Sequence, residues 1–435
     1  MPLVSVAVGV LGALACLIAG FWAMQRRRLI DDLPTSKTQG VFLGLAELKG
    51  TAESEAPLTS YLAGVRCVHY EWQVEEHWSR TVHETYTDSK GHVRTRTRTE
   101  SGWTKVADGR ESVPFYLKDD TGVIRVVPEG ARINALETFA ETFSRDNPLY
   151  FGKGPAKEVA NSTHKRRFRE SALPLHASLY VLGQARERTD IVAAEIAFQK
   201  GAAIFLISTR TEKQISSRYA RWFWFWILLG LVIAATGTTV SGLTSTPPAG
   251  FPWTSVLLTW AGYVLALLLG WVWAVYNSLV ALHHRVEQGW SQVDVQLKRR
   301  ADLIPNLVAV VEAYSGFEKA TQVAVTQLRQ QMESTPSGVA GPDYKGVVPV
   351  LRATIERYPA LKASDAFLRL QRSLEDTEQR IALARDYYNS IATFYNSRLE
   401  IVPDRYVGSF ARLRSGALMS AADFERAPMH VKLVS

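Results

Sequence analysis

Three polar side chains in the C-terminal half have the spacing of an acid–base or metal site. Asp294, Asp302 and Asn306 lie one or two turns apart if this region is helical. Carboxylates at this spacing can bind a cation or exchange a proton, but such groups also form structural networks with basic neighbours. We adopt the second interpretation and expect a polar network between helices, with Arg299 or Arg300 as the partner.

Three asparagines beside tyrosines raise the same question. Asn277, Asn389 and Asn396 either bind a ligand or fix the register of neighbouring helices, and the second role is commoner. His283 and His284 point about 100° apart on a helix, so they cannot chelate one ion together. Because no phosphate-binding loop, nucleophile elbow or zinc-protease pattern occurs either, we expect no catalytic residue, no cofactor and no metal.

The densest basic patch lies in the N-terminal half. It consists of Lys165, Arg166, Arg167 and Arg169. One interpretation is a solvated loop, and the other is contact with anionic lipid headgroups, which attract cations by about 1 kcal/mol each near the surface. The sequence leaves both open. With a net charge of +8, we expect anionic headgroups rather than nucleic acid as the partner.

Basic and aromatic residues are interleaved just before an apolar segment. They are Arg218, Arg221, Trp222, Trp224 and Trp226. Amphipathic rings favour the headgroup layer, and arginine is enriched on the cytoplasmic side of membrane helices. We therefore expect these five residues at a membrane interface.

Three apolar segments must position these side chains. Residues 3–24, 222–240 and 253–275 are each long enough, at about 1.5 Å per residue, to cross about 30 Å of hydrocarbon. Arginines at 26–28 follow the first segment, whereas a signal peptide carries its positive charge before the apolar run, so we expect an anchor. Arginines mark one side of all three segments, which places the N-terminus outside and both soluble regions in the cytoplasm. The expected location is a bacterial inner membrane.

Residues 38–217 alternate between apolar and polar side chains, as half-buried strands do. Strand pairs are expected around turns at residues 88–91, 118–122 and 188–190, with a last strand within 202–208. The arginine- and threonine-rich segment 93–98 is typical of a solvated edge strand. A short helix is expected around residues 135–143.

This region resembles the GIDE domain of membrane-bound E3 ubiquitin ligases. The resemblance is carried by residues 57–60, 64–68, 113–115 and 137–139, and by a β pair that runs directly into an apolar helix. It implies a membrane-adjacent domain. Those ligases carry a zinc-binding RING finger after the second span, and this sequence has no cysteine after Cys67, so the resemblance does not extend to ligase activity.

Residues 276–435 switch to helical periodicity. One apolar stripe, with no Gly or Pro between Trp271 and Gln288, predicts that the third apolar helix continues into a long amphipathic helix. A second long helix is predicted over 364–401, ending before Pro403. The region resembles the LemA family of membrane-anchored helical bundles, through residues 276–280, Trp290, 294–308, 356–359, 387–389 and 395–396.

The expected protein is a membrane α+β protein. It has three transmembrane helices, a mainly antiparallel β domain between the first and second, and a C-terminal elongated antiparallel helical bundle with coiled-coil-like packing. We expect a non-enzymatic scaffold that binds membrane or cytoplasmic proteins or self-associates through the bundle. The alternative is a component of a GIDE-type, ubiquitin-ligase-like pathway or an unrecognised enzyme in the β domain.

Overall fold

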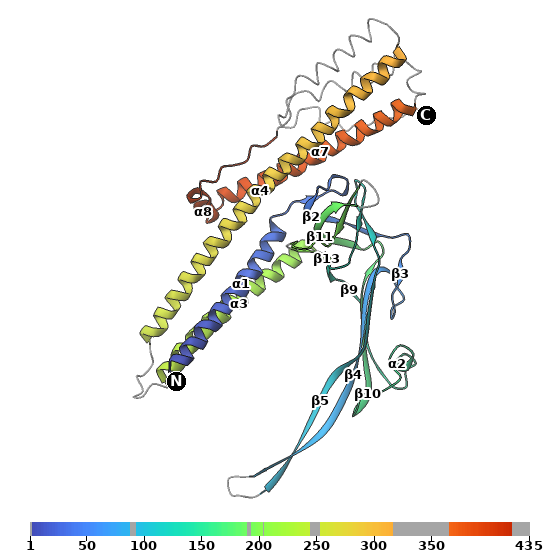
Figure 1. Ribbon diagram of the computed structural model, residues 1–435. Helices are drawn as coiled ribbons and strands as arrows, with labels where there is room; N and C mark the ends of the chain where they lie inside the picture. Colours follow the sequence, from blue (N-terminus) through green and yellow to red (C-terminus); the bar gives the residue numbers. More distant parts are fainter. Residues whose placement is uncertain are drawn as a thin grey trace. The chain divides into compact units, whose positions relative to one another are not determined.

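A computed structural model describes most of the chain (Figure 1). The described residues are 2–87, 93–188, 193–202, 204–243, 253–315 and 365–419. They fall into two compact units, the β unit, Thr35–Glu212, and the helical unit, Met1–Pro34 with Lys213–Ser435. Residues 356–359, which contribute to the LemA resemblance, lie outside the described residues.

One sheet of the β unit contains five strands that pair in a closed ring. The ring runs through β2 (Gly44–Glu53), β6 (Phe115–Lys118), β7 (Val123–Val126), β12 (Ala194–Ala197) and β11 (Ser178–Glu187), which pairs again with β2. The other strands of this sheet are β1 (Thr35–Ser36), β8 (Arg132–Asn134) and β13 (Leu206–Ser208). The 3-10 turn η1 (Thr38–Gly40) follows β1 in the sequence. Leu48, Phe115 and Val181 are fully buried in the core of this sheet. The ring of strands thus encloses a single core formed by their alternating apolar residues.

The strand pairs predicted around two turns are confirmed. β6 pairs with β7 across residues 119–122, and β11 pairs with β12. Residues 189–192 of the second turn lie outside the described part of the chain. The predicted last strand is confirmed as β13, although residue 203 is not described.

A second sheet contains the two longest strands. Its members are β3 (Leu58–Thr59), β4 (Arg66–Thr87), β5 (Val93–Ser112), β9 (Leu136–Ser144) and β10 (Ser162–Pro174). The short helix α2 (Leu149–Gly152) lies between β9 and β10 in the sequence. β10 pairs with β4 only as far as Trp78, whereas β5 follows β4 to Thr87. The end of this hairpin is therefore a two-stranded ribbon, visible in Figure 1 as the long blue pair.

The ribbon confirms the predicted edge strand. β5 pairs with β4, and the described side chains of residues 95–99 are exposed. Charged and threonine side chains protect such an edge from pairing with another chain. The predicted turn at residues 88–91 lies outside the described residues.

The helix predicted around residues 135–143 is wrong. This segment forms β9, which pairs antiparallel with β10. Phe143 packs against the buried Phe168 with ring centroids 5.8 Å apart, and the edge of β10 provides the hydrogen-bonding partners. Pairing and packing contributed from another strand outweigh the local preference of a short polar segment.

The helical unit contains three helices that are long and apolar enough to cross a membrane. These are α1 (Pro2–Asp31), α3 (Glu212–Leu243) and α4 (Trp253–Ser315). The remaining described helices are α7 (Asp365–Glu400) and α8 (Asp404–Phe410). All three predicted apolar segments lie in helices, but each helix extends beyond its segment, and α3 begins ten residues before Trp222.

Small residues allow α1 and α3 to pack closely side by side (Figure 1). A Cβ atom on Gly9 would lie 2.8 Å from the Cα of Gly237, and the reverse holds for a Cβ on Gly237. Tyr263 of α4 donates a hydrogen bond to the carbonyl oxygen of Ile227 in α3 at 2.9 Å. Glycine at such crossings lets two helix backbones approach directly.

Replacing Gly237 with leucine should therefore force α1 and α3 apart. We expect a loss of about 1–3 kcal/mol, as is typical for overpacking. Gly262→Leu in α4 is the matched control, because a Cβ there has no neighbour within 4 Å. Thermal denaturation in detergent micelles compares the two variants, and equal melting temperatures would contradict the close packing.

The third apolar segment continues without a break into the helix that packs against α7. α4 is one helix of 63 residues, and it is unbroken between Trp271 and Gln288, where the absence of Gly and Pro predicted continuity. Along it, Trp290 contacts Tyr388 and His283 contacts Tyr395, so α4 and α7 run antiparallel. α7 ends at Glu400, confirming the predicted end before Pro403.

Candidate functional site

The predicted polar residues of α4 differ in their surroundings. The acids that approach Arg299 and Arg300 come from α7, where Asp376 lies 3.9 Å and Glu378 3.5 Å from the guanidinium groups. Asp302 and Asn306 are exposed, and Asn277 is exposed near the start of the amphipathic part of α4. One carboxylate oxygen of Asp294 is buried, with no hydrogen-bond partner among the described residues.

Two of the predicted asparagines bind main chain instead of a neighbouring helix. Asn389 donates its amide to the carbonyl oxygen of Met419 at 2.9 Å and accepts from the Met419 N–H at 2.9 Å. Asn396 holds Gly416 in the same way, at 2.9 and 2.8 Å. Tyr388 donates its hydroxyl to the carbonyl oxygen of Ala417 at 2.5 Å. Asn389 and Asn396, which lie seven residues apart on α7, thus hold the segment after α8 along α7.

A buried charge cluster lies where α1, α4, α7 and α8 meet. Asp32 follows α1 directly, and one of its carboxylate oxygens lies 2.8 Å from a guanidinium nitrogen of Arg398 on α7. Arg398 also donates to Asp404 of α8 at 2.6 Å. Ser278 of α4 donates to the other Asp32 oxygen at 2.6 Å, and Arg285 donates to the Asp32 carbonyl oxygen at 3.3 Å. The aspartate–arginine–aspartate chain therefore joins α1, α7 and α8, and Ser278 and Arg285 join α4 to it.

The electrostatics of this cluster follow from its burial. The Asp32, Arg398 and Asp404 side chains are 6%, 14% and 10% exposed. Burial raises the pKa of Asp32, while Arg398 and the hydrogen bond from Ser278 lower it, and burial prevails. Charges in such a place depend on their partners, because each would be costly to bury alone. The arrangement holds helices together and exposes little of any charged group to a ligand.

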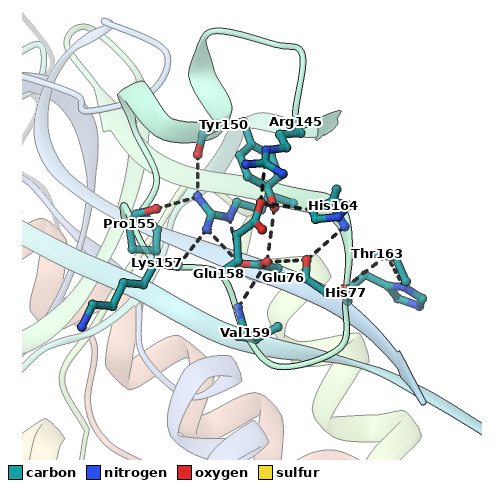
Figure 2. Close-up of polar contacts among 12 residues, drawn as sticks. Glu76, His77, Arg145, Tyr150, Pro155, Lys157, Glu158, Val159, Thr163 and His164 are labelled. Carbon is teal, nitrogen blue, oxygen red and sulfur yellow. Dashed lines mark hydrogen bonds and ion pairs between the residues drawn. The ribbon is translucent and has the colours of Figure 1, made fainter. Parts of the chain in front are cut away.

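A second buried charge cluster lies in the β unit (Figure 2). Arg166 and Glu76 are both fully buried, and the guanidinium group contacts one Glu76 carboxylate oxygen at 2.9 Å. The same guanidinium donates to the carbonyl oxygens of Tyr150, Pro155 and Lys157 at 2.7, 2.8 and 3.1 Å. All of its nitrogens thus have partners within the fold.

The Glu76 carboxylate has an equally complete set of partners. Its other oxygen accepts from the Ser162 hydroxyl at 2.6 Å, the Tyr150 hydroxyl at 3.2 Å and the Val159 N–H at 3.4 Å. The guanidinium of Arg166 also lies 4.0 Å from the centroid of the Tyr150 ring. Through these contacts, which Figure 2 draws as dashed lines, the cluster fastens the segment around α2 to β4 and β10.

This burial corrects the expected headgroup contact for Arg166. In β10, Phe168 and Glu170 are buried like Arg166, whereas Lys165 and Arg169 are exposed on the other face. Arg167 is half-buried and contacts a carboxylate oxygen of Glu75 and the Trp103 ring. Alternation along a strand was the signal in the sequence that could have separated Arg166 from its neighbours.

The residues predicted at a membrane interface lie along α3. Arg218, Arg221, Trp222 and Trp224 are exposed, and Trp226 is half-buried. Trp222 stacks on Trp226 with ring centroids 6.1 Å apart. Among the described residues, no group of three His, Cys, Asp or Glu side chains could hold a metal ion.

His69 gives the β unit a specific sensitivity to acid. The side chain is 4% exposed, and its Nδ1 lies 2.7 Å from the Ser112 hydroxyl. Burial, with a smaller contribution from Arg110, lowers the pKa of His69 to about 4. The unfolded chain takes up this proton near pH 6.5, whereas the folded chain does so only near pH 4. Stability contributed by neutral His69 is therefore lost as the pH falls through this window.

We expect the free energy of unfolding to fall by about 1.4 kcal/mol per pH unit between pH 6 and 5 from this residue. His69→Gln should flatten that part of the profile, because glutamine does not titrate. The denaturant midpoint of unfolding, monitored by hydrogen exchange in β4, is measured for both chains across this pH range. Parallel profiles for the two chains would show that His69 is not responsible.

Comparisons with known proteins identify two regions. Residues 289–433 match the family model described as the LemA family, and residues 83–242 match the GIDE model, described as E3 Ubiquitin ligase. The chain therefore joins a LemA-type region to a GIDE-type region, which confirms the fusion indicated by its motifs. No solved structure matches the chain significantly.

Curated relatives match over part of the chain. Protein LemA of Metamycoplasma hominis is 25% identical over 169 residues, which cover 37% of this chain and 77% of that protein. Magnetosome protein MamQ of Magnetospirillum gryphiswaldense is 23% identical over 164 residues, covering 30% of this chain and 60% of that protein. Magnetosome protein MamQ 2 of Paramagnetospirillum magneticum has the same identity and coverage.

Proposed function

We propose that this protein is a membrane-anchored, non-enzymatic scaffold of the LemA type. In this proposal α1, α3 and α4 cross a bacterial inner membrane, with the N-terminus outside and both soluble domains in the cytoplasm. The two soluble domains correspond to residues 38–217 and 276–435. The bundle binds membrane or cytoplasmic proteins or a second copy of the chain.

One observation carries the proposal. α4 runs as a single helix from its apolar part into the region that packs against α7, while Asp32 fastens the end of α1 to Arg398 of the same region. A bundle held by two apolar helices is presented at a fixed distance from the membrane that they cross. The buried charges support this interpretation, because Asp32, Arg398 and Arg166 are engaged by partners within the fold.

Membrane contact by the β domain is part of the proposal. Of the basic residues considered, Lys165 and Arg169 are exposed on β10 and are the side chains available to anionic headgroups. Arg218, Arg221, Trp222, Trp224 and Trp226 are proposed to lie at the cytoplasmic interface. The chain joins the β domain to an apolar helix at each end, which keeps this domain close to the bilayer.

Reporter fusions and co-purification test the proposal together. A periplasm-active phosphatase should be active when fused after Pro248 and inactive after Pro34 or at the C-terminus, and a periplasmic C-terminus would overturn the cytoplasmic assignment. Affinity purification from membranes should recover protein partners with the full chain and lose them when residues 276–435 are deleted.

The match to the model described as E3 Ubiquitin ligase favours one alternative. In it, the β domain acts within a ubiquitin-ligase-like modification pathway or as an unrecognised enzyme. The same purification discriminates between the two. Partners retained without the bundle, together with turnover of a protein modifier, would replace the scaffold with this alternative.

A further inference from the structure

An exposed apolar surface, here called the α7–α8 corner, lies where α7 ends and α8 begins. It is formed by Ile401, Val402, Tyr406 and Phe410, which are 55%, 61%, 69% and 94% exposed. Four large apolar side chains within ten residues are too many to leave in water without a reason, and such patches mark surfaces that bind something. The question is what covers this corner.

Contacts within the helical unit show which residues of α4 lie beside the apolar corner. The buried Val407 of α8 packs with Val275 and Leu279 of α4, and Trp271 packs against the same cluster. A Cβ on Gly408 would lie 2.8 Å from a side-chain carbon of Leu399, so α8 also lies tightly on α7. α8 is therefore held beside the residues where the third apolar segment ends.

The buried charge cluster of the helical unit also holds α8 in place. Asp404 in the first turn of α8 is bound by Arg398, which also binds Asp32 at the end of α1. α8 thus lies beside the end of the third apolar segment and is linked through Arg398 to Asp32, which follows α1. If these helices cross a bilayer, as the proposed function requires, α8 lies at its cytoplasmic surface.

The composition of the corner fits that surface. Arg405, Arg412 and Arg414 are exposed close to the apolar residues in the sequence. Aromatic rings beside arginines favour the headgroup layer, where the ring is partly buried in hydrocarbon and the cation meets anionic lipid. The exposed Trp273 and Tyr276 of α4 continue the same aromatic character at this level.

We propose that the α7–α8 corner is a membrane-interface anchor, which inserts Tyr406 and Phe410 among the lipid headgroups. This inference rests on the proposed membrane crossing and goes beyond it, because it adds a contact made by the bundle itself. Asn389 and Asn396 support this anchor by holding the segment after α8 against α7. The bundle is then fixed to the bilayer surface as well as to its helices.

The test uses the full-length protein in nanodiscs that contain anionic lipid. An environment-sensitive fluorophore is attached to Phe410→Cys, and separately to Val295→Cys and Leu265→Cys. The two native cysteines are buried, so the unsubstituted chain gives the background labelling. Val295 is the matched control, because it is an exposed apolar residue of α4 about 24 Å beyond Leu279 at about 1.5 Å per residue. Lipids with a nitroxide near the headgroup quench a label that lies among the headgroups, and lipids with a nitroxide deep in the acyl chain quench a label at residue 265, in the middle of the third apolar segment.

We expect a blue-shifted emission and at least about twofold stronger quenching at residue 410 than at residue 295. Strong acyl-chain quenching at residue 265 with equal, weak headgroup quenching at residues 410 and 295 would overturn the anchor and leave the membrane crossing intact. Weak acyl-chain quenching at residue 265 would instead overturn the membrane crossing, and the anchor with it. Val402→Cys provides a second exposed position on the corner, where the same result as at residue 410 is expected.

Discussion

Arg398→Leu should lower the free energy of unfolding of the helical unit by about 3–5 kcal/mol, because it leaves two buried carboxylates without their partner. Asp32 and Asp404 both bind this one guanidinium, and both are at most 10% exposed. Desolvation already raises the pKa of Asp32. The loss should shrink toward acidic pH, since protonated carboxyl groups are cheaper to bury. Chemical denaturation in micelles, followed by hydrogen exchange in α7, measures it.

Arg380→Leu is the matched control on the same helix. Arg380 pairs with Asp376 four residues away, and its side chain is 37% exposed, so its loss should cost less than about 1 kcal/mol. Replacing Asp32 and Asp404 with asparagine in the Arg398→Leu chain should recover part of the stability, because no unpaired charge remains buried. Equal effects of Arg398→Leu and Arg380→Leu would contradict the structural role of the cluster.

The second large effect is expected in the β unit. Arg166→Leu should cost about 3–5 kcal/mol, since Glu76 would remain fully buried without its counter-charge and three carbonyl oxygens would lose their donor. Hydrogen exchange in β4 and β10 under increasing denaturant measures this loss. Glu76→Gln in the same chain should restore part of it.

The neighbouring residue provides the comparison. Arg167→Leu removes a pair in which the arginine side chain is 27% exposed, and we expect a loss of at most about 1 kcal/mol. A stable Arg166→Leu chain that has lost affinity for anionic vesicles would restore the headgroup interpretation of Arg166. A destabilised chain with unchanged lipid affinity is the result that the buried cluster predicts.

Most of the strands and helices could be predicted from the periodicity of apolar residues in the sequence. Alternation located the strands on either side of residues 119–122, and three-to-four spacing located α4 and α7, because burial of one face imposes these patterns. In residues 165–170 the same alternation places Arg166 with Phe168 and Glu170 on the buried face of β10. β9 was misassigned because its stability depends on pairing with β10, which a local pattern does not contain.

The charge cluster of the helical unit could not be predicted in this way. Asp32 and Arg398 are 366 residues apart in the sequence, and only the packing of α1 against the bundle brings them together. Asn389 and Asn396 were predicted to bind a ligand or to fix helix register, whereas their partner in the structure is the main chain at Gly416 and Met419, which no side-chain pattern reveals. Long-range polar contacts of this kind depend on the tertiary fold.

The scaffold proposal is tested most directly by photo-crosslinking in intact membranes. A photoreactive amino acid at Val295, which is exposed on the bundle part of α4, is compared with one at the buried Leu282 of the same helix in the full-length chain. We predict discrete cross-links from residue 295 to another protein or to a second copy, and none between chains from residue 282. Absence of any protein cross-link from residue 295, with modifier turnover by the purified chain, would contradict the scaffold.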